Sequence, residues 1–492
     1  MPSTTYGRPV SAGDVSFRRA MALVVMSVVL PGSAQLALGR RQAGQLILRV
    51  WLALVALTLL VAVVFLIDGG LVLSIAVRPT LLGLLRWGAL AVGVGWAAVV
   101  AHAYWLSHPP LIERSRRLIA TLTTGAVCLV ILGPALFLSN VARTQEDFLA
   151  LFPDTGVSSL PGRVNVLLLG GDAGADRTGL RPDSINVASI DTDTGRAVLF
   201  GLPRNMQRVP FPDDSPLAAN FPQGFVCDDG SCMLNGIYTY GVDHPELFPS
   251  GASDVERGAS AMEQAVGAAL GLDVQYFAMV DLGGFEGIID ALGGIQIDVQ
   301  SRVAIGGNAD DPNAPIEGYI EPGVQTLDGH RALWYARSRT DSDDYIRMQR
   351  QRCVLGAIVN QADPATVVLN YQELAQTAGT TIATDVPQGT LDDFIDVGLK
   401  TKSQPLTSVQ FVPPLVPNTA DPDFTLIRAT VESAIDSSED LPDPDSADSA
   451  PAEPDPADGG ETPPDTGTDP GESTAGEASA DPVAVEEVCS YG

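Results

Sequence analysis

The apolar residues of this chain follow two different patterns, and these patterns divide its 492 residues into a membrane part and a folded part. Near the N-terminus they form long runs, whereas beyond residue 160 they form short runs separated by Gly, Pro and Asp. A helix needs about 20 apolar residues to cross the hydrocarbon core of a bilayer. The long runs therefore predict a membrane region, residues 1–143, with hydrophobic segments at about 21–38, 46–67, 82–106 and 118–139.

The first hydrophobic segment leaves the number of spans open at three or four. It is short and is interrupted by Pro31-Gly32, so it fits a span, a re-entrant hairpin or an interfacial helix. Arg18 and Arg19 precede it and favour the cytoplasm, which agrees better with three full spans and a re-entrant first segment.

Positive charge predicts the orientation of the membrane region. Arginines cluster at the start of the second hydrophobic segment, at Arg40, Arg41 and Arg49, and before the last one, at Arg114, Arg116 and Arg117. Loops rich in arginine stay in the cytoplasm. We therefore expect a multi-pass protein of the cell membrane whose residues beyond about 139 are extracytoplasmic.

Beyond a short stalk at residues 144–160, the short apolar runs predict alternating strands and helices. Strands are expected at Val164–Leu169, Ile185–Ile190, Ala197–Leu202, Tyr276–Val280 and Ile295–Val299. Helices are expected from the capping box at Ser253 to about Leu270, and at Phe285–Leu292, Asp328–Ser338 and Asp344–Gln361. This alternation predicts an extracellular α/β domain, residues 161–435, with a central mixed sheet sandwiched by helices.

The C-terminal part differs in composition and charge. Residues 436–492 hold 17 acidic residues and neither Lys nor Arg, which predicts a disordered acidic tail at 436–482. Residues 483–492 become apolar again and include Cys489. The net charge is +9 for residues 1–143 and −22 for residues 144–435, and so acidic a domain would repel nucleic acid. We therefore expect no nucleic acid partner.

The five cysteines fit an oxidising compartment. Cys128 lies within the last hydrophobic segment and is expected to be a packed thiol. Cys227 and Cys232 flank a polar loop and predict a small disulfide. A second hypothesis pairs Cys353 with Cys489, which would close the tail into a loop, and free thiols are the equally weighted alternative.

Candidate chemistry concentrates in Tyr335–Gln351. Arg337 and Arg339 stand two apart, and Asp344, Arg347 and Gln351 follow at a spacing that places them on one helical face. Clustered guanidinium groups suit phosphate, which they can bind bidentately. The alternative, for this segment alone, is a structural helix with salt bridges.

Further charged residues stand where the predicted strands begin or end. Asp172 follows the first strand, Arg181 and Asp183 precede the second, and Arg204 follows the third. Two carboxylates beside phosphates would bind Mg²⁺, or Mn²⁺, with water completing the coordination. The four histidines are scattered, and neither a nucleophile elbow nor a Walker loop occurs, which disfavours zinc chemistry, serine hydrolases and NTPases.

Taken in order, these residues resemble the LytR–CpsA–Psr family of cell-wall proteins. The resemblance runs roughly from Arg163 to Gln361 through Asn165–Asp172, Arg181–Ser184, Leu202–Arg204, Asn235–Gly241, Val280–Gly294, Leu327–Gly329 and Tyr335–Gln351. The N-terminal Leu30–Arg41 segment, the several hydrophobic segments and the Cys227–Cys232 loop are similar to the actinobacterial branch.

The resemblance implies roles for individual residues. Metal ligands would be Asp172 and Asp183, and catalytic residues would be Arg204, Arg337, Arg339 and Asp344. Pyrophosphate ligands would be Arg181, Arg204, Arg337, Arg339, Arg347 and Gln351. Two positions depart from the family pattern: Asn205 stands where many members have Asp, and Met233 stands where many have a phosphate-contacting Lys.

The resemblance also implies a function. Such a protein would be a Mg-dependent phosphotransferase that moves a glycopolymer from a polyprenyl-pyrophosphate carrier in the membrane onto peptidoglycan, through a phosphodiester bond. The apolar faces of Tyr276–Leu292 and Val354–Val359 are candidates for a lipid groove, with ordinary core as the alternative. A polyprenyl-pyrophosphate hydrolase, or a non-catalytic membrane-anchored protein that binds the lipid carrier or regulates the wall, would also fit.

Overall fold

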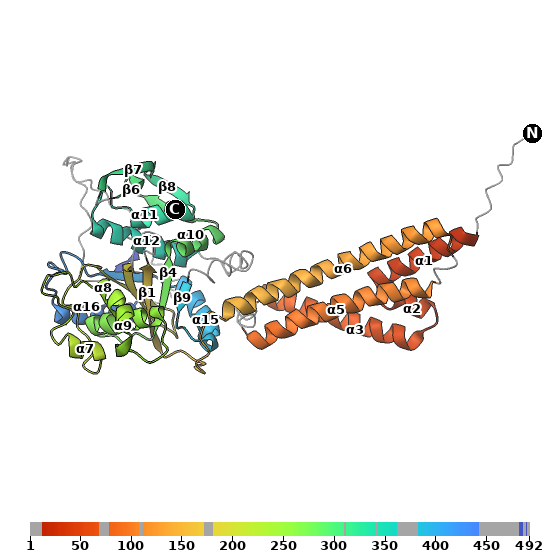
Figure 1. Cartoon of the computed structure of the whole chain (residues 1–492), viewed down its shortest axis with the longest axis horizontal. Coiled ribbons are helices and arrows are strands. Elements are labelled where there is room, and N and C mark those ends of the chain that lie inside the picture. Colours follow the sequence, from red (N-terminus) through yellow and green to blue (C-terminus); the bar gives the residue numbers. More distant parts are fainter. Residues whose placement is uncertain are drawn as a thin grey trace, which may run out of the picture. The chain divides into compact units, whose positions relative to one another are not determined.

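A computed structural model describes most of the chain, and it divides into two compact units, Met1–Leu149 and Ala150–Gly492 (Figure 1). The residues described are 12–67, 78–107, 112–171, 181–308, 311–340, 342–361, 382–441, 482–485 and 489. The first residues of the expected disordered tail, 436–439, instead belong to a helix, Phe424–Glu439. Residues 442–481 and Asp172 lie outside the described residues.

The first unit consists of helices. They are α1 (Ala12–Val29), α2 (Ser33–Ala37), α3 (Arg41–Ile67), α5 (Pro79–Leu106) and α6 (Arg114–Leu149). Within the described residues, three stretches are long and apolar enough to cross a membrane, namely Arg41–Val64, Pro79–Leu106 and Arg114–Leu149. The helix α1 is not among them. A turn at Pro31-Gly32, where Gly32 has a φ of 94°, separates α1 from α2, and α6 continues through the first residues of the expected stalk.

Small residues and a few polar contacts hold these helices together. Gly93 of α5 approaches Ala135 of α6 so closely that a side chain at Gly93 would not fit, as is common between membrane helices. The indole of Trp96 donates to the carbonyl of Ser27, and the Gln35 amide donates to the carbonyl of Val99, each at 3.2 Å. These bonds give the polar side chains of Trp96 and Gln35 partners that lipid could not supply.

The second unit is built on a seven-stranded mixed sheet, as predicted. Its strands are β1 (Arg163–Gly171), β2 (Pro182–Asp191), β3 (Ala197–Leu202), β4 (Tyr276–Asp281), β9 (Ile382–Thr384), β10 (Leu406–Gln410) and β11 (Val483–Ala484). They lie in the order β11-β10-β3-β2-β1-β4-β9. The pairs β1–β4 and β3–β10 are parallel, and the other pairs are antiparallel.

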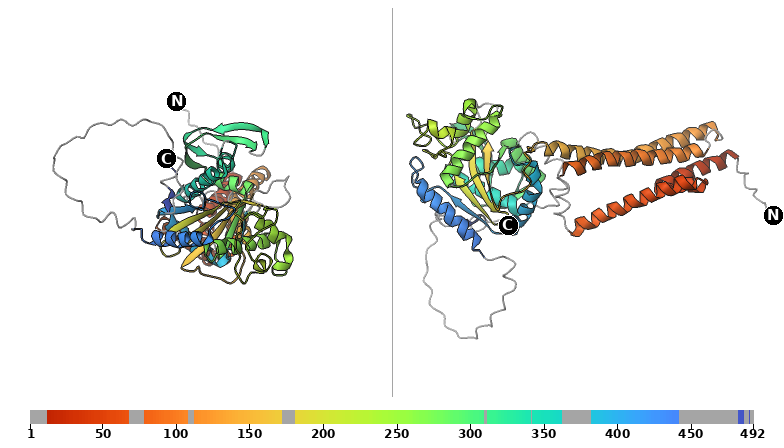
Figure 2. Two further views of the ribbon diagram at one scale, coloured as in Figure 1. Left: turned by 90° about the vertical axis from the view of Figure 1, so that its left-hand side faces the viewer. Right: turned by 90° about the horizontal axis from the view of Figure 1, so that it is seen from below.

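Helices α8 (Gly236–Asp243), α9 (Asp254–Leu270) and α16 (Phe424–Glu439) cover one face of the sheet, and Figures 1 and 2 show the remaining large helices on the other. The capping box at Ser253 is present, because Ser253 and Glu256 each bond the other's backbone N–H. Gly271 ends α9 at a φ of 71°, which favours glycine. Short helical turns, α7 (Pro216–Asn220) and η2 (Pro245–Leu247), complete this layer.

The opposite layer contains α10 (Leu282–Ala291), α11 (Gly329–Arg337) and α12 (Asp344–Gln361). Two short ladders accompany them, β5 (Ile295–Val299) with β8 (Gly323–Leu327) and β6 (Val303–Asn308) with β7 (Asp311–Ile320). The sequence patterns predict β5 but not β6, β7 or β8. The turn η3 (Gln388–Thr390) and the helix α15 (Leu391–Lys402) follow β9 in the chain.

Two disulfides join described residues of this unit. Cys227 is bonded to Cys232, and Cys353 of α12 is bonded to Cys489. The residues before Cys489 form β11, which pairs with β10 at the edge of the sheet. Cys128 is a free, half-buried thiol in α6. The C-terminal segment thus docks on the α/β unit and pairs with Cys353, which is the arrangement that the sequence left open.

A carboxyl pair lies on the α9 side of the sheet. Glu263 of α9 shares a hydrogen bond with Asp385, whose Oδ1 also accepts from the backbone N–H of Phe277 at 2.7 Å. Burial, and after it the neighbouring Asp385 carboxyl, raises the pKa of Glu263 to about 9. The pair therefore keeps a proton at neutral pH.

We expect this pair to make stability depend on pH. Because the pKa of Glu263 is higher in the folded than in the unfolded state, its contribution is complete below about pH 4.5 and is lost as the pH rises toward 9. Glu263→Gln should remove that loss, so the melting temperature of the variant should fall less than the wild-type value between about pH 5 and pH 9. Thermal unfolding followed by circular dichroism measures the melting temperatures of wild type and of Glu263→Gln at each pH.

The exposed Glu246 provides the matched control. Glu246→Gln should leave the pH dependence of the melting temperature unchanged. If Glu263→Gln and wild type lose the same number of degrees over this range, Glu263 does not hold the proton.

Candidate functional site

The strand β1 serves two different layers because its side chains alternate. Leu167 and Leu169 belong to the core under α9, and Leu169 also borders the cavity described next. Leu168 and Gly170 line a cavity on the opposite face, together with their cross-strand neighbours Asn186, Ser184, Ala278 and Val280. The site therefore lies between the sheet and the layer of α10, α11 and α12.

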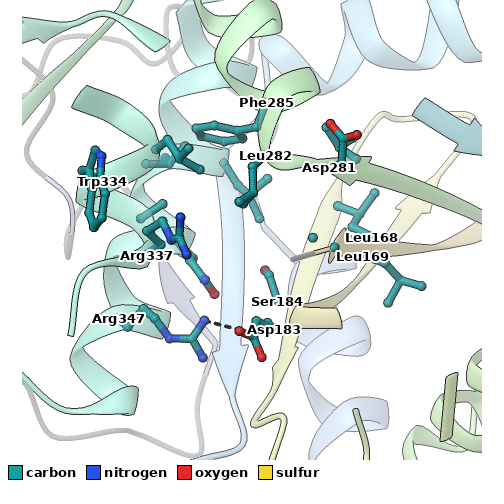
Figure 3. A pocket seen from close by; sticks show the side chains of 18 of the residues that line it. Leu168, Leu169, Asp183, Ser184, Asp281, Leu282, Phe285, Trp334, Arg337 and Arg347 are labelled. Carbon is teal, nitrogen blue, oxygen red and sulfur yellow. Dashed lines mark hydrogen bonds between the residues drawn. The ribbon is translucent and has the colours of Figure 1, made fainter. Parts of the chain in front are cut away.

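The cavity has a volume of about 450 Å³ and two chemically distinct parts (Figure 3). Its apolar lining comes from the sheet and from all three helices and includes Leu168, Val280, Phe285, Ile288, Leu333, Val354, Leu355 and Ile358. Its polar lining consists of Asp183, Ser184, Asn186, Asp281, Arg337, Ser338, Arg339, Thr340, Arg347 and Gln351. Both stretches expected to line a groove, Tyr276–Leu292 and Val354–Val359, contribute to it.

A local irregularity in the sheet sets the position of Asp183. Gly170 pairs with Ser184 and Gly171 pairs with Pro182, so the ladder between β1 and β2 skips Asp183. Such a bulge redirects the side chain of the extra residue. Asp183 lines the cavity, and its Oδ1 accepts a hydrogen bond from Arg204 Nη1 at 2.6 Å.

Arg204 links the carboxylates of two separate elements. It follows β3, and its backbone carbonyl accepts a hydrogen bond from the N–H of Asn235. Besides its bond to Asp183, its Nε lies 3.5 Å from Oδ1 of Asp344, the first residue of α12. One guanidinium thus holds the start of β2 and the start of α12 at a fixed separation.

Arg347 makes the most deeply buried polar contacts of the site. Its side chain is 4% exposed and donates to Asp344 Oδ1 from Nε at 3.2 Å and from Nη2 at 2.9 Å. Its Nη1 donates to the backbone carbonyl of Asp183 at 2.8 Å. Burial lowers the pKa of Arg347 from its usual value, and the Asp344 carboxylate counteracts that effect.

Two further arginines and an amide complete the polar end. Arg337 ends α11, and its guanidinium lies 5.2 Å from the ring centroid of Trp334. Arg339 stands two residues later, in the segment between α11 and α12, and both side chains are half-buried. Gln351 lies one turn beyond Arg347 on α12, and all three side chains line the cavity with Arg347.

Three predicted site residues are not among the described residues that line the cavity. Two of them, Arg204 and Asp344, bond to the lining residues Asp183 and Arg347. Arg181 is exposed, immediately before β2, and is not among the described residues that line the cavity. Asp172 lies outside the described residues, so its position relative to Asp183 stays a prediction.

The sequence patterns missed Asp281 and Arg350. Asp281 caps α10 by accepting from the N–H of Gly284 at 2.8 Å, and it also lines the cavity. The Asp-x-x-Gly spacing before a helix was the signal that would have found it. Arg350 is buried three residues after Arg347, and a cation at an otherwise apolar helical position was its signal.

The described residues provide few metal ligands of their own. They contain no group of three or more His, Cys, Asp or Glu residues placed to hold a metal ion. Asp183 offers one carboxylate at the polar end of the cavity, with one oxygen directed to Arg204. This set fits only an ion that binds one or two carboxylates and takes its other ligands from water and phosphate, which is typical of Mg²⁺.

The described parts of the chain thus define a protein with apolar helices and an α/β unit whose cavity is apolar at one end and rich in arginine at the other. The chain belongs to the LytR_cpsA_psr family, whose model matches residues 146–419.

Similar proteins come from several bacteria. The cell wall biosynthesis protein LcpA of Corynebacterium glutamicum is 28% identical over 241 residues, which cover 44% of this chain and 43% of LcpA. The polyisoprenyl-teichoic acid–peptidoglycan teichoic acid transferase TagU of Oceanobacillus iheyensis is 26% identical over 234 residues, 47% of this chain and 62% of TagU. The matches thus span less than two thirds of either relative.

Among solved structures, TagT (YwtF) of Bacillus subtilis with bound octaprenyl pyrophosphate lipid is similar at a TM-score of 0.35. The sequence identity is 18%, and the match covers 56% of this chain and 90% of the TagT chain.

Arg347→Met should lower the free energy of unfolding of the α/β unit by about 3 kcal/mol, because it leaves Asp344 and the Asp183 carbonyl without their buried partner. Urea unfolding in detergent micelles, followed by near-UV circular dichroism, measures the change. Arg181→Met is the matched control on the surface and should change the free energy by less than about 0.5 kcal/mol. A decrease of less than about 1 kcal/mol in the free energy of unfolding of Arg347→Met would show that Arg347 does not hold α12 to β2.

Proposed function

We propose that this protein transfers a glycopolymer from a polyprenyl-pyrophosphate carrier onto peptidoglycan, and that it joins the two by a phosphodiester bond. The observation that supports this proposal most directly is the composition of the cavity. An apolar pocket that ends in Arg337, Arg339 and Arg347 matches a ligand with a hydrocarbon chain at one end and a pyrophosphate at the other. The family membership and the transferase names of relatives such as TagU point the same way.

The proposed reaction needs no nucleotide, because the pyrophosphate bond supplies the driving force. A hydroxyl oxygen of peptidoglycan attacks the phosphorus that bears the sugar and forms the new P–O bond. The bond from that phosphorus to the bridging oxygen breaks, and polyprenyl phosphate leaves with the bond's electron pair. Arg337 and Arg339 would bind the charge that accumulates on the leaving phosphate, and such electrostatic stabilisation dominates phosphoryl transfer.

Asp344 would receive or direct the proton of the attacking hydroxyl. The contacts with Arg347 and Arg204 all end on its Oδ1. They fix the orientation of the carboxylate, and Oδ2 is then the oxygen that would face the hydroxyl. Arg204 would hold Asp183 and Asp344 in register while the phosphates bind.

We further propose that Asp183, with Asp172, holds Mg²⁺ or Mn²⁺ beside the pyrophosphate. When bound, such an ion neutralises phosphate charge. Asp183 fits this role because the bulge directs it to the polar end of the cavity.

The proposed location is extracytoplasmic, at the surface of the cell membrane. The arginines at the start of the second hydrophobic segment and before the last one favour this orientation, and the Cys227–Cys232 and Cys353–Cys489 disulfides suit an oxidising compartment. The likeness to LcpA supports placing the chain in the actinobacterial branch of the family.

The decisive experiment uses the full-length protein in lipid nanodiscs with Mg²⁺, a polyprenyl-pyrophosphate oligosaccharide and peptidoglycan fragments. Mass spectrometry should detect polyprenyl phosphate together with a phosphodiester-linked glycan on the fragments. Polyprenyl phosphate with only free sugar phosphate would instead identify a hydrolase. Bound donor without any product would identify a carrier-binding protein.

Arg337→Ala and Arg339→Ala should each lower the transfer rate about 100-fold or more, because each removes a guanidinium that stabilises the leaving phosphate. Arg302→Ala is the control, since Arg302 pairs with Glu321 on the surface and its loss should leave the rate within about twofold. Wild-type rates in both cavity variants, with unchanged melting temperatures, would refute the pyrophosphate assignment.

Removal of divalent cations with EDTA should lower the transfer rate, and added Mg²⁺ or Mn²⁺ should restore it. Asp183→Asn should raise the Mg²⁺ concentration needed for half the maximal rate by about 10-fold, because it removes a charged ligand. The exposed Asp243 supplies the matched variant Asp243→Asn, which should behave as wild type. A rate that is indifferent to EDTA would exclude a role for the metal.

A further inference from the structure

The helix α12 carries three buried arginines, and only one of them, Arg347, is among the described residues that line the cavity. Arg347, Arg350 and Arg352 are 3%, 7% and 7% exposed. Arginine is rarely buried unless its donors are paired. Arg347 holds Asp344 and β2, and Arg352 donates to Ser408 Oγ of β10 at 3.2 Å. Arg350 points to a different element.

Arg350 reaches the segment that connects α11 to α12. Its Nη2 donates to the backbone carbonyl of Ser338 and to Ser342 Oγ, the latter at 2.7 Å. The guanidinium carbon lies 5.8 Å from the ring centroid of Tyr335, which is itself buried. One nitrogen of the guanidinium therefore binds the connecting segment at Ser338 and at Ser342, and the group packs against Tyr335 of α11.

The carbonyl that Arg350 holds lies between the two cavity arginines. Ser338 is extended, with φ −61° and ψ 132°, directly after the last helical residue Arg337. Across one extended residue, the side chains before and after it fall on the same side of the backbone. Fixing Ser338 in this conformation therefore directs Arg337 and Arg339 to the same cavity.

A second contact, with β6, holds the same segment. Thr340 Oγ1 lies 3.4 Å from the carbonyl of Gly306 in β6, and a side chain at Gly307 would collide with Thr340. Ser338 is buried, whereas Arg337 and Arg339 are half-buried. The backbone is thus clamped while the two guanidinium groups extend into the cavity.

We propose that Arg350 is a positioning residue for the transfer reaction, which sets the spacing and direction of Arg337 and Arg339 through the Ser338 carbonyl. Arg350 is not among the described residues that line the cavity, so it acts through these arginines and not on the substrate. Arginine suits this role better than lysine, because its planar guanidinium packs against Tyr335 while Nη2 donates to both Ser338 and Ser342. This inference rests on the proposed function of the site.

The test compares two buried arginines of one helix in the full-length protein in nanodiscs. Arg350→Met should raise the Kd for inorganic pyrophosphate about 10-fold and lower the kcat of transfer on the order of 100-fold. Arg352→Met removes a buried guanidinium that contacts β10, and it should lower the melting temperature while leaving the Kd for pyrophosphate unchanged. Calorimetric titration and thermal unfolding provide these values.

Two milder variants cover the case in which Arg350→Met does not fold. Arg350→Lys should retain the fold and still bind pyrophosphate less tightly than wild type. Ser342→Ala should raise the Kd for pyrophosphate by a smaller factor than Arg350→Lys does. In the Arg350→Lys background, Ser342→Ala should raise the Kd by a smaller factor than it does in wild type, because the two residues act through one contact.

The outcomes separate this inference from the proposed function. If wild type binds pyrophosphate and Arg350→Lys binds it equally well, the positioning role is wrong and the function stands. If Arg350→Met and Arg352→Met raise the Kd equally, Arg350 is only a structural residue. If wild type binds no pyrophosphate and transfers nothing, the proposed function fails and the role of Arg350 fails with it.

Discussion

The buried Arg347 guanidinium is the interaction on which the site depends most. It binds a carboxylate of its own helix and a backbone carbonyl of β2, so it fixes α12 to the sheet at the point where the cavity is polar. Desolvation opposes a charge in this position, and several simultaneous hydrogen bonds are needed to offset it. That requirement explains why Asp344, Arg204 and Asp183 form one connected network instead of separate surface pairs.

The sequence predicted most of this arrangement where a local rule applies. The short apolar runs located β1 to β5, and the capping box located the start of α9. Helical spacing placed Arg347 and Gln351 on one face, and both line the cavity. The hydrophobic runs predicted the three long apolar helices within the described residues. In each case a pattern of neighbouring residues was sufficient, from four residues in the capping box to about twenty in a membrane segment.

The remaining features depend on contacts between distant segments, which leave little local trace. The ladder of β6 and β7 contains many glycines and prolines, so its strands carry no clear alternation. The pairing of Arg350 with Ser338 depends on how α12 packs against α11. Arg181 was predicted to bind pyrophosphate and Asp183 to bind a metal, but of the two only Asp183, which lies at the bulge, lines the cavity. The β11 pairing depends on a contact between segments more than seventy residues apart.

The alternation of β1 gives the two faces of one strand separate tasks. Leu167 and Leu169 contribute to the core, whereas Leu168, Gly170 and, on the next strand, Ala278 form the floor of the cavity. A larger side chain at Ala278 would fill part of the cavity without entering the core under α9, whereas a side chain at Gly170 would press on Ser184 of β2. Substitutions of this kind would change the shape of the cavity while the core under α9 stays the same. The stability of the core and the shape of the cavity thus depend largely on different side chains, so evolution can change one with little effect on the other.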